Sequence, residues 1–510
     1  MGKIVDKSTF SKEIKPYLRR EGKTIALCHG VFDLVHPGHV IHLQQAKEMA
    51  DVLVVSITAA AYVRKGPGRP YFNDETRMQF LEAIECVDYV MLSEGYTVDD
   101  IVECVEPDFY VKGEEYAKEN DDITGNMTPE RKLVEKHGGI VRYTGGQTYS
   151  STRLINTAFS GLTEDVLVYM RHMKEKYSMK DIRKYAEAAK QFKVLVVGDV
   201  IIDKYTYCDV QGLMSKDMGY SARVNYIEAY LGGAVAISRH LSSFSDKVTL
   251  LSMIGNESEW LEKINNELKD KLQLQLVNSN TFPTIVKHRY LTRNAKREEY
   301  RKIFAINNIP ESLEYEMEAR SKFIKLLRSE MKEADVVFVC DFGHGLIDEP
   351  TMKILEEDAK CLILNCQTNS TNQGMNIITK YSRADFFALD QKELRLAFPT
   401  YRTDEKEALV RLTQHLTGKG WLTRGSKGAY GIDGETIYES PALTLNVKDT
   451  VGAGDAFYAV AGLYAAAGAP IEVGTLMGNI SGALGANIVG NKEAVEKVNV
   501  LKFASTLMNI

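Results

Sequence analysis

The chain has 510 residues, of which 44% are hydrophobic and 26% are charged, so its composition is that of a soluble globular protein with several domains. Its net charge of −6 lacks the basic surplus that is typical of nucleic-acid-binding proteins. The 7 cysteines form no C-x-x-C pair, which excludes a zinc knuckle, and no apolar run is long enough to span a membrane. Without an apolar signal core at the N-terminus, the expected location is the cytoplasm.

Apolar runs and helical patterns alternate along the first 159 residues. Strands are expected at 24–27, 52–57, 87–92 and 109–112, and helices at 39–50 and 74–86, the second after Asn73 as its N-cap. Strands that alternate with helices predict a parallel sheet covered on both faces.

Residues 160–190 are rich in Lys, Glu and Met at helical spacing and are expected to form a helical connector. A new strand at 193–199 then starts a second alternating region, 191–510, with later strands at 336–340, 361–364 and 386–389. The sequence therefore predicts an α/β protein with two domains.

Two histidines follow the first strand, in the segment His36-Pro37-Gly38-His39. Ligands of a parallel α/β sheet bind where a strand ends, so both rings are expected to face one anion at the start of the next helix. Backbone N–H groups of that helix add partial positive charge. Displacement at an α-phosphate needs positioning and charge stabilisation, which two imidazoles can supply. A zinc pair or two structural histidines is the alternative interpretation.

A second glycine- and hydroxyl-rich segment, 145–153, closes the same region. It contains Ser150, Ser151 and Thr152 and leads into a predicted helix. Such a turn is suited to holding a β- or γ-phosphate, and its presence favours the phosphate interpretation of the two histidines.

These segments resemble the H-x-G-H nucleotidyltransferases, which include glycerol-phosphate and choline-phosphate cytidylyltransferases and the adenylyltransferase domain of ADP-heptose synthase. The resemblance implies a Rossmann-like nucleotidyltransferase domain at 1–159, in which His36 and His39 stabilise developing charge and Lys47 reaches the phosphates. It assigns nucleotide contacts to Gly30, Phe32, Asp33, Lys112, Ser150, Ser151 and Thr152, and substrate contacts to Lys65 and Arg77.

The second motif spans 449–455, with the sequence DTVGAGD, and opens an apolar helix. Its glycine turn exposes backbone N–H groups that can cradle a transferring phosphoryl group. Asp455, in the first helical turn, is placed to accept the proton of an attacking hydroxyl. A glycine turn followed by an acidic residue without function is the alternative. No Walker A motif occurs in the sequence, which excludes a P-loop kinase.

Residues 191–510 resemble the ribokinase family of sugar kinases, and within it the kinase domain of ADP-heptose synthase. The motifs that carry this resemblance lie at 198–203, 232–234, 283–289, 341, 391–393 and 423–428. The resemblance implies a doubly wound α/β domain with Asp455 as the catalytic base. It assigns nucleotide contacts to Thr423, Gly425, Gly428, Gly452, Ala453 and Gly454, sugar contacts to Asp199, Asp203, Gly232, Gly233, Lys287 and Arg289, and support of magnesium through water to Glu393.

Some positions depart from that kinase pattern. Ala236 stands where an asparagine follows the glycine pair, the D-P-K strand end reads Asn365-Cys366-Gln367, and Asp390 replaces the asparagine of N-x-x-E. Ala236 and Gln367 are expected to remove polar contacts to sugar or phosphate, which indicates a different sugar or a weakened kinase. The domain order also differs, because the heptose enzyme carries its kinase first.

Both resemblances together imply a bifunctional enzyme of the ADP-heptose synthase type. Its kinase would use Mg²⁺ and ATP to phosphorylate a sugar phosphate, and its transferase would join a sugar 1-phosphate to a nucleotide with release of pyrophosphate. Two alternatives stay open: a CTP-dependent polyol- or sugar-phosphate cytidylyltransferase fused to its kinase, and a transferase with a non-catalytic kinase-like module. The expected partners are the nucleotide and sugar phosphate substrates and a second copy of the chain in a homodimer, without nucleic acid or membrane.

Overall fold

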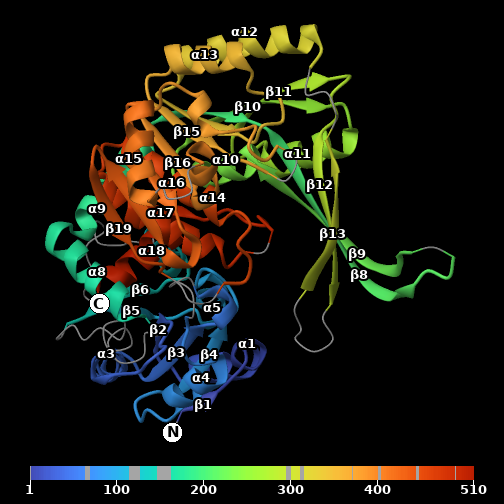
Figure 1. The fold of residues 1–510 in the computed structure, drawn as a ribbon. Coiled ribbons are helices and arrows are strands. Elements are labelled where there is room, and N and C mark those ends of the chain that lie inside the picture. The colour runs from blue at the N-terminus through green and yellow to red at the C-terminus, as the bar shows by residue number, and fades with distance from the viewer. Residues whose placement is uncertain are drawn as a thin grey trace. The chain divides into compact units, whose positions relative to one another are not determined.

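A computed structural model describes residues 2–63, 69–113, 127–145, 162–216, 218–293, 300–309, 315–369, 372–399, 404–443, 447–488 and 490–509. The chain divides into two compact units, one of Met1–Thr163 with Leu501–Ile510 and one of Glu164–Val500 (Figure 1). The domain limits 1–159, 160–190 and 191–510 stay a prediction. Among the described residues, no helix is both long and apolar enough to pass through a lipid bilayer.

A parallel sheet forms the centre of the first unit, in the strand order β1-β4-β3-β2-β5-β6. Its strands are β1 (Lys3–Ile4), β2 (Ile25–Gly30), β3 (Val52–Thr58), β4 (Tyr89–Ser93), β5 (Phe109–Gly113) and β6 (Ile140–Thr144). The central strands are apolar and buried, as expected for a parallel sheet covered on both faces. The chain continues from β2 to β3 on one side and later adds β5 on the other, so the end of β2 is a topological switch point, where ligands bind.

The helices of this unit are α1 (Lys7–Thr9), α2 (Lys15–Arg20), α3 (Pro37–Glu48), α4 (Asp74–Glu82), α5 (Asp99–Val105) and α6 (Met127–Lys136). Helix α3 begins at Pro37, earlier than predicted, because proline has the fixed φ and the missing N–H that suit a first helical position. Helix α4 begins after its predicted N-cap, Asn73, whose side chain accepts a hydrogen bond from the Thr76 backbone.

A longer sheet forms the centre of the second unit, in the order β11-β10-β7-β14-β15-β16-β17-β18-β19. The strands from β11 to β17 are parallel, whereas β18 and β19 are antiparallel. They are β7 (Lys193–Gly198), β10 (Lys247–Gly255), β11 (Gln273–Ser279), β14 (Val336–Asp341), β15 (Leu362–Cys366), β16 (Phe386–Asp390), β17 (Lys419–Thr423), β18 (Ala429–Asp433) and β19 (Thr436–Ser440).

Helices pack on both faces of this sheet. Helices α12 (Met317–Glu333), α13 (Glu349–Asp358), α14 (Gln391–Ala397) and α15 (Glu405–Leu416) join one apolar core with the strands. Helices α10 (Ala234–Ser242), α16 (Ala453–Ala466) and α17 (Ile471–Gly485) pack together on the other face. The remaining helices are α8 (Glu164–Lys176), α9 (Met179–Ala189), α11 (Ser258–Leu268) and α18 (Lys497–Met508), which crosses the division between the units.

A separate sheet, here called the lid sheet, has the order β13-β12-β8-β9. Its strands are β8 (Val200–Leu213), β9 (Tyr220–Gly233), β12 (Ile285–Arg293) and β13 (Tyr300–Asn308). Strands β8 and β9 form a long hairpin that extends away from the main sheet of the unit (Figure 1). Because β8 starts directly after β7, the lid sheet is anchored where the main sheet carries Asp199.

The predicted connector contains α8 and α9, and α8 is tied to α17 through a buried glutamate. Glu472 in the first turn of α17 is only 5% exposed. Its carboxylate accepts hydrogen bonds from His172 Nε2 at 2.9 Å, Lys176 Nζ at 3.2 Å and Tyr177 Oη at 3.0 Å. Three donors around one buried carboxylate satisfy its charge and fix the position of α8 within the second unit.

Replacing this carboxylate should loosen α8 without unfolding the sheet. In Glu472→Ala, the three donors lose their shared partner, and a cost of about 2–3 kcal/mol is expected for the contact. Hydrogen–deuterium exchange should therefore rise in 164–176 while β14 and β15 stay protected. Glu175→Ala, which removes an exposed carboxylate from the same helix, is the matched control. Equal exchange in both variants would contradict the assignment.

Candidate active sites

The two histidines of the first unit lie together at the start of α3. His36 is the N-cap residue and is only 6% exposed, and its ring stacks on that of His39 with centroids 4.0 Å apart. Burial lowers the pKa of the His36 imidazole below its ordinary value. A neutral imidazole donates one N–H, so the pair and the helix N-terminus can offer several hydrogen-bond donors to an anion.

The residues just before these histidines shape the site rather than extend it. Phe32 places its ring edge against His39, with centroids 5.2 Å apart, and lies over Gly30. Asp33 is buried, and its carboxylate accepts hydrogen bonds from Arg69 Nε at 2.7 Å and from the Tyr71 backbone at 2.7 Å. In the structure, Asp33 therefore fixes the chain around residues 69–72, and its predicted nucleotide contact stays a prediction.

The predicted contact of Lys47 with the phosphates stays a prediction. Lys47 lies in the last turn of α3, and its Nζ donates to Asp88 Oδ2 at 2.6 Å, just before β4 begins. With a rise of 1.5 Å per residue, the helix carries Lys47 about 12 Å beyond His39, toward the amino ends of the strands. A lysine at the end of a helix is drawn to acceptors there, because the last carbonyl groups carry partial negative charge.

Arg77, predicted to contact the substrate, is fully buried in α4. Its Nη1 donates to the carbonyl oxygens of Val31 at 2.6 Å and Thr58 at 2.9 Å, and its Nη2 donates to Asp74. These acceptors follow or end β2 and β3, so Arg77 joins the chain at the ends of two neighbouring strands. In the structure Arg77 supports the site through these bonds, and its predicted contact with the substrate stays a prediction.

Lys112, at the end of β5, forms an ion pair with Glu130 at 3.2 Å, and its Nζ lies 4.9 Å from the ring centroid of Tyr110. Its predicted nucleotide contact stays a prediction. Lys65, Ser150, Ser151 and Thr152 lie outside the described residues.

Sequence reasoning missed a third histidine on α3. His42 Nδ1 lies 2.6 Å from Oγ1 of Thr144, which ends β6 just before the glycine-rich segment. Burial lowers the pKa of His42 to about 4, so its ring is neutral at pH 7. The repeated spacing of three residues from His36 through His39 to His42 was the available signal. Among the described residues, no cluster of three or more His, Cys, Asp or Glu side chains is arranged to hold a metal ion.

In the second unit, Asp455 lies in the first turn of α16, after a tight glycine turn. Gly452 is the N-cap residue with φ of 83°, and a Cβ there would overlap Oδ1 of Asn491, so the position requires glycine on both counts. Gly454 faces open space, and with Ala453 it presents the helix N-terminus. This arrangement leaves room for a phosphoryl group beside the carboxylate of Asp455.

Burial raises the pKa of Asp455 to about 6, against hydrogen bonding from Gln367 and the charge of Lys287, which favour its ionised form. A carboxylate with a pKa near 6 is a competent proton acceptor at neutral pH. Its position at a helix N-terminus and its burial are the physical features expected of a catalytic base.

The predicted sugar-binding residues converge at the carboxyl end of β7 and the base of the lid sheet. Asp203 on β8 forms an ion pair with Arg289 on β12, and Lys287 lies two residues before Arg289 on that strand. A Cβ on Gly232 would overlap the carboxylate of Asp203, so the predicted glycine is needed for this close approach. Gly233, the N-cap of α10, follows it.

Asp199 follows β7 and is 3% exposed, and its Oδ2 accepts from the Phe342 backbone at 3.2 Å. Burial and the neighbouring Asp341 raise the pKa of Asp199 to about 7. Burial also lowers the pKa of Lys287, although Asp203 and Asp199 favour its charged form. The site thus combines buried acceptors and a buried cation, which suits a polar ligand with hydroxyl and anionic groups.

The predicted nucleotide loop lies between β17 and β18. Thr423 ends β17 and donates from its hydroxyl to the carbonyl oxygen of Leu389 at 3.4 Å. Gly425 begins a short 3-10 turn, Gly425–Lys427, and Gly428 closes it before β18. Thr423, Gly425 and Gly428 thus share the carboxyl end of the main sheet with Asp455, and their predicted nucleotide contacts stay predictions.

Glu393 forms a capping box with Asp390 at the start of α14. Its oxygens accept from the backbone N–H groups of Asp390 at 2.8 Å and Thr368 at 3.2 Å, while Asp390 accepts from the Glu393 backbone. Asparagine and aspartate are both good N-cap residues, which explains why the departure at Asp390 keeps the local structure. Burial raises the pKa of Glu393 to about 8.

Two further residues of this site were not predicted to contribute to it. Gln367, which was expected to remove a polar contact to sugar or phosphate, donates from its Nε2 to Asp455 Oδ1 at 3.0 Å. His344, in the turn after β14, is 1% exposed, and burial and Lys287 lower its pKa to about 4. Its position between Gly343 and Gly345 after an apolar strand was the available signal.

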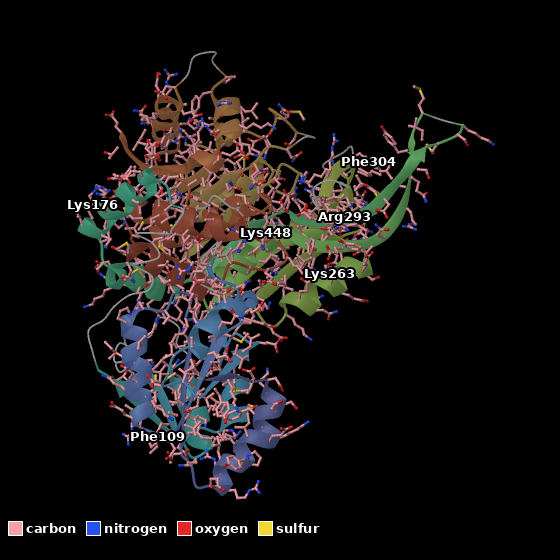
Figure 2. The ribbon with its side chains drawn as sticks, turned by 90° about the horizontal axis from the view of Figure 1, so that it is seen from below. Phe109, Lys176, Lys263, Arg293, Phe304 and Lys448 are labelled. Atoms are coloured by element: carbon pink, nitrogen blue, oxygen red, sulfur yellow. The ribbon has the colours of Figure 1, made fainter. Side chains whose placement is uncertain are left out.

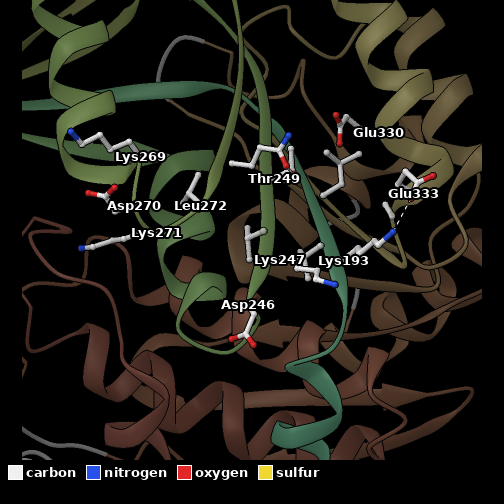
Figure 3. Close-up of a pocket in the computed structure, with 15 residues that line it drawn as sticks. Lys193, Asp246, Lys247, Thr249, Lys269, Asp270, Lys271, Leu272, Glu330 and Glu333 are labelled. Carbon is white, nitrogen blue, oxygen red and sulfur yellow. Dashed lines mark hydrogen bonds and ion pairs between the residues drawn. The ribbon is translucent and has the colours of Figure 1, made fainter.

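A cavity of about 600 Å³ lies elsewhere in this unit, and charged side chains of both signs line it (Figure 3). Lys193 and Lys247 begin β7 and β10, and Glu333 ends α12 and bonds Lys193 at 2.8 Å. The cavity is therefore at the amino ends of the strands, on the opposite edge from Asp199 and Asp455. Ligands of parallel α/β sheets bind at the carboxyl ends, so this cavity is separate from the catalytic constellation.

Comparison with curated proteins finds relatives for part of the chain. The bifunctional protein HldE of Syntrophotalea carbinolica is 38% identical over 125 residues, which cover 24% of this chain and 24% of that protein. HldE of Desulfatibacillum aliphaticivorans is 37% identical over 147 residues (28% and 29%), and HldE of Hahella chejuensis is 40% identical over 126 residues (24% and 25%). The chain thus matches less than a third of the length of each of these relatives.

Comparison with solved structures finds ribokinase from Thermotoga maritima, 16% identical with a TM-score of 0.48, over 62% of this chain and 99% of that chain. Phosphofructokinase-2 from Escherichia coli in complex with potassium is 13% identical with a TM-score of 0.49, over the same 62% and 99%.

Family models match both regions that carry the motifs. The cytidylyltransferase-like model matches residues 27–184, and the pfkB family carbohydrate kinase model matches residues 191–494. Together with the sheets, they confirm the predicted fold class, and they place the transferase-like region first, as read from the sequence. Because residues 191–494 are more than half of the 510, the chain belongs to the pfkB family of carbohydrate kinases, with a cytidylyltransferase-like region ahead of its kinase domain.

Proposed function

We propose that this protein is a bifunctional sugar-phosphate kinase and sugar-1-phosphate nucleotidyltransferase of the ADP-heptose synthase type. The kinase would move the γ-phosphoryl group of ATP onto a hydroxyl of a sugar phosphate. The transferase would then join a sugar 1-phosphate to a nucleotide and release pyrophosphate. The relatives named bifunctional protein HldE and the presence of both family matches in one chain support this pairing of activities.

The constellation around Asp455 carries the kinase half of the proposal. Asp455 would accept the proton of the attacking hydroxyl while the O–P bond to the acceptor forms and the bond to ADP breaks. The helix N-terminus at Gly452–Gly454 would stabilise the transferring phosphoryl group. Lys287 and Asp203 at the base of the lid sheet would hold the acceptor.

The transferase half rests on the stacked histidines at the start of α3. An oxygen of the sugar 1-phosphate would attack the α-phosphorus, and the bond from that phosphorus to the β-phosphate oxygen would break. His36 and His39 would donate to the phosphate oxygens as charge develops, without forming a covalent intermediate.

Mg²⁺ is expected to arrive with the phosphates of ATP, where it would neutralise charge on the transferring group. Glu393 fits contact through water rather than direct ligation, because each of its oxygens already accepts a backbone N–H and keeps one lone pair. We propose ATP at both sites, with CTP as the alternative at the transferase site, and the match to a carbohydrate kinase family supports ATP at the kinase site.

A homodimer and a cytoplasmic location complete the proposal. The outer strand and the hairpin of the lid sheet expose large apolar side chains, among them Phe304 at 52%, Ile306 at 56% and Leu213 at 75% (Figure 2). Apolar side chains gathered on one exposed sheet favour association with another protein surface.

The two activities should be separable by single substitutions. Asp455→Asn removes the proton acceptor, so ADP formation from ATP and a sugar phosphate should fall by about 10³-fold while pyrophosphate release persists. His39→Ala should show the reverse pattern. Coupled assays for ADP and for pyrophosphate on the same preparations measure both.

In each variant, the activity that the substitution leaves unaffected shows that the chain is folded. Unchanged ADP formation in Asp455→Asn would sink the kinase assignment and favour the non-catalytic module. Loss of both activities in both variants would contradict two independent sites.

The kinase should lose activity in acid through Asp455. Its pKa is raised to about 6, and the base must be ionised, so activity is full above that value and is lost as pH falls through it. At pH 5, kcat should be about tenfold below its plateau. Pyrophosphate release in the same buffers is the control, and a flat kcat profile down to pH 5 would exclude Asp455 as the titrating base.

The choice of nucleotide is tested by pyrophosphate release with ATP and with CTP across sugar 1-phosphates and polyol phosphates. We expect turnover with ATP and a heptose 1-phosphate, abolished by His39→Ala. Turnover with CTP and a polyol phosphate would instead assign the cytidylyltransferase alternative.

A further inference from the structure

Gln367 connects the end of β15 to the proposed catalytic base. Its Nε2 donates to Asp455 Oδ1 at 3.0 Å and to Asn365 Oδ1 at 2.9 Å. Its backbone is held as well, because its N–H donates to the carbonyl oxygen of Asp341 at 2.8 Å and its carbonyl accepts from Asn376 Nδ2 at 2.9 Å. The residue is therefore fixed at both its main chain and its side chain.

The hydrogen-bond network also determines which way the amide groups point. Asn365 Nδ2 donates to the carbonyl oxygen of Ala388 at 2.9 Å, so its Oδ1 is turned toward Gln367. An oxygen in that position requires a donor, which places the NH₂ group of Gln367, rather than its carbonyl oxygen, between Asn365 and Asp455. Both N–H bonds of Gln367 are then in use, one toward each neighbour.

We propose that Gln367 is a positioning residue that holds the carboxylate of Asp455 for proton transfer, with Asn365 as its support. The bond to Oδ1 fixes the rotation of the carboxylate and directs Oδ2 toward the acceptor hydroxyl. This inference rests on the proposed kinase function. The expected loss of a polar contact to sugar or phosphate at Gln367 stays a prediction, and the bond to the base is a separate contact that the sequence did not indicate.

The replacement of an aspartate and a lysine by Asn365 and Gln367 leaves the net charge near Asp455 unchanged. An aspartate and a lysine at the two positions would be an ion pair with no net charge, and Asn365 with Gln367 is also neutral. The electrostatic surroundings of Asp455 are therefore preserved, whereas a single change at either position would introduce a full charge. Two amides also avoid the desolvation cost of burying two charges beside the base.

Other groups also influence the pKa of Asp455, so Gln367 accounts for only part of it. The charged and titratable side chains that influence it come from the lid sheet, from β14, from α14 and from its own helix: Asp203, Lys287, Cys340, Glu393 and Tyr458. Lys287 favours its ionised form and Asp203 opposes it. Variants at 367 leave these groups in place.

Two substitutions of Gln367 should shift the acid limb of the kcat profile in opposite directions. Gln367→Leu removes the donor, so the acid limb of the kcat profile should move up by about one pH unit, which by itself lowers kcat at pH 7 about twofold. Loss of the fixed carboxylate orientation should lower the plateau of kcat by about fivefold more. Gln367→Lys keeps a donor and adds positive charge, so the limb should move down while the KM for ATP stays close to that of the unaltered protein. Gln275→Leu is the matched control, because it removes a glutamine–carboxylate bond (to Glu330, 3.2 Å) remote from this site.

The same shift should be visible without an acceptor sugar. The infrared absorption of protonated Asp455 is obtained by subtracting Asp455→Asn from the full-length protein, and its titration should move in the same directions in the two Gln367 variants. If Gln367→Leu does not fold, Gln367→Met, which also removes the donor at similar length, takes its place.

An unmoved titration in folded Gln367 variants would overturn the positioning role while leaving the kinase function intact. Full kinase activity in Asp455→Asn would instead overturn the function on which the inference rests. The two failures are distinguishable because the infrared titration does not depend on turnover.

Discussion

The burial of one carboxylate at the start of α16 is the constraint on which the kinase-like unit depends. Removing Asp455 from water disfavours its charge, and the structure offsets this with a helix N-terminus, the cation of Lys287 and the amide of Gln367. The balance leaves the pKa of Asp455 at about 6. Groups from the lid sheet, β15 and α16 are needed for that balance, so the chemistry depends on how these elements meet.

The same region also requires glycine at two positions, because other side chains lie where a Cβ atom would be. The carboxylate of Asp203 occupies the space that a Cβ on Gly232 would need, and the side chain of Asn491 does the same at Gly452. Each glycine lets a polar side chain from a distant part of the sequence lie against the backbone. The glycine motifs of this chain are therefore spatial features as much as turn signals.

The first unit shows how a residue within a motif can serve the fold instead of the ligand. Asp33 and Lys47 lie near the histidines in sequence and Arg77 lies farther along the chain, yet each forms ion pairs or backbone hydrogen bonds inside the unit. Arg77 links the chain after β2 to the end of β3, which keeps the start of α3 in place. A charged residue near a motif in the sequence need not contact the ligand. Its hydrogen-bond partner in the structure shows what it does.

The sequence by itself determined the alternation of strands and helices, the two phosphate motifs and the fold class. These are local properties. A buried parallel strand is a run of apolar residues, and the N-cap and first-turn residues indicate where a helix begins. Tertiary structure decided the lid sheet, the internal roles of Lys47 and Arg77, and the bond between Gln367 and Asp455. Strands β9 and β13 of the lid sheet expose most of their side chains, and β12 pairs with β8 from a distant part of the chain, so their pattern resembles no buried strand. The partner of Gln367 lies 88 residues away, and no periodicity in the sequence relates two such positions.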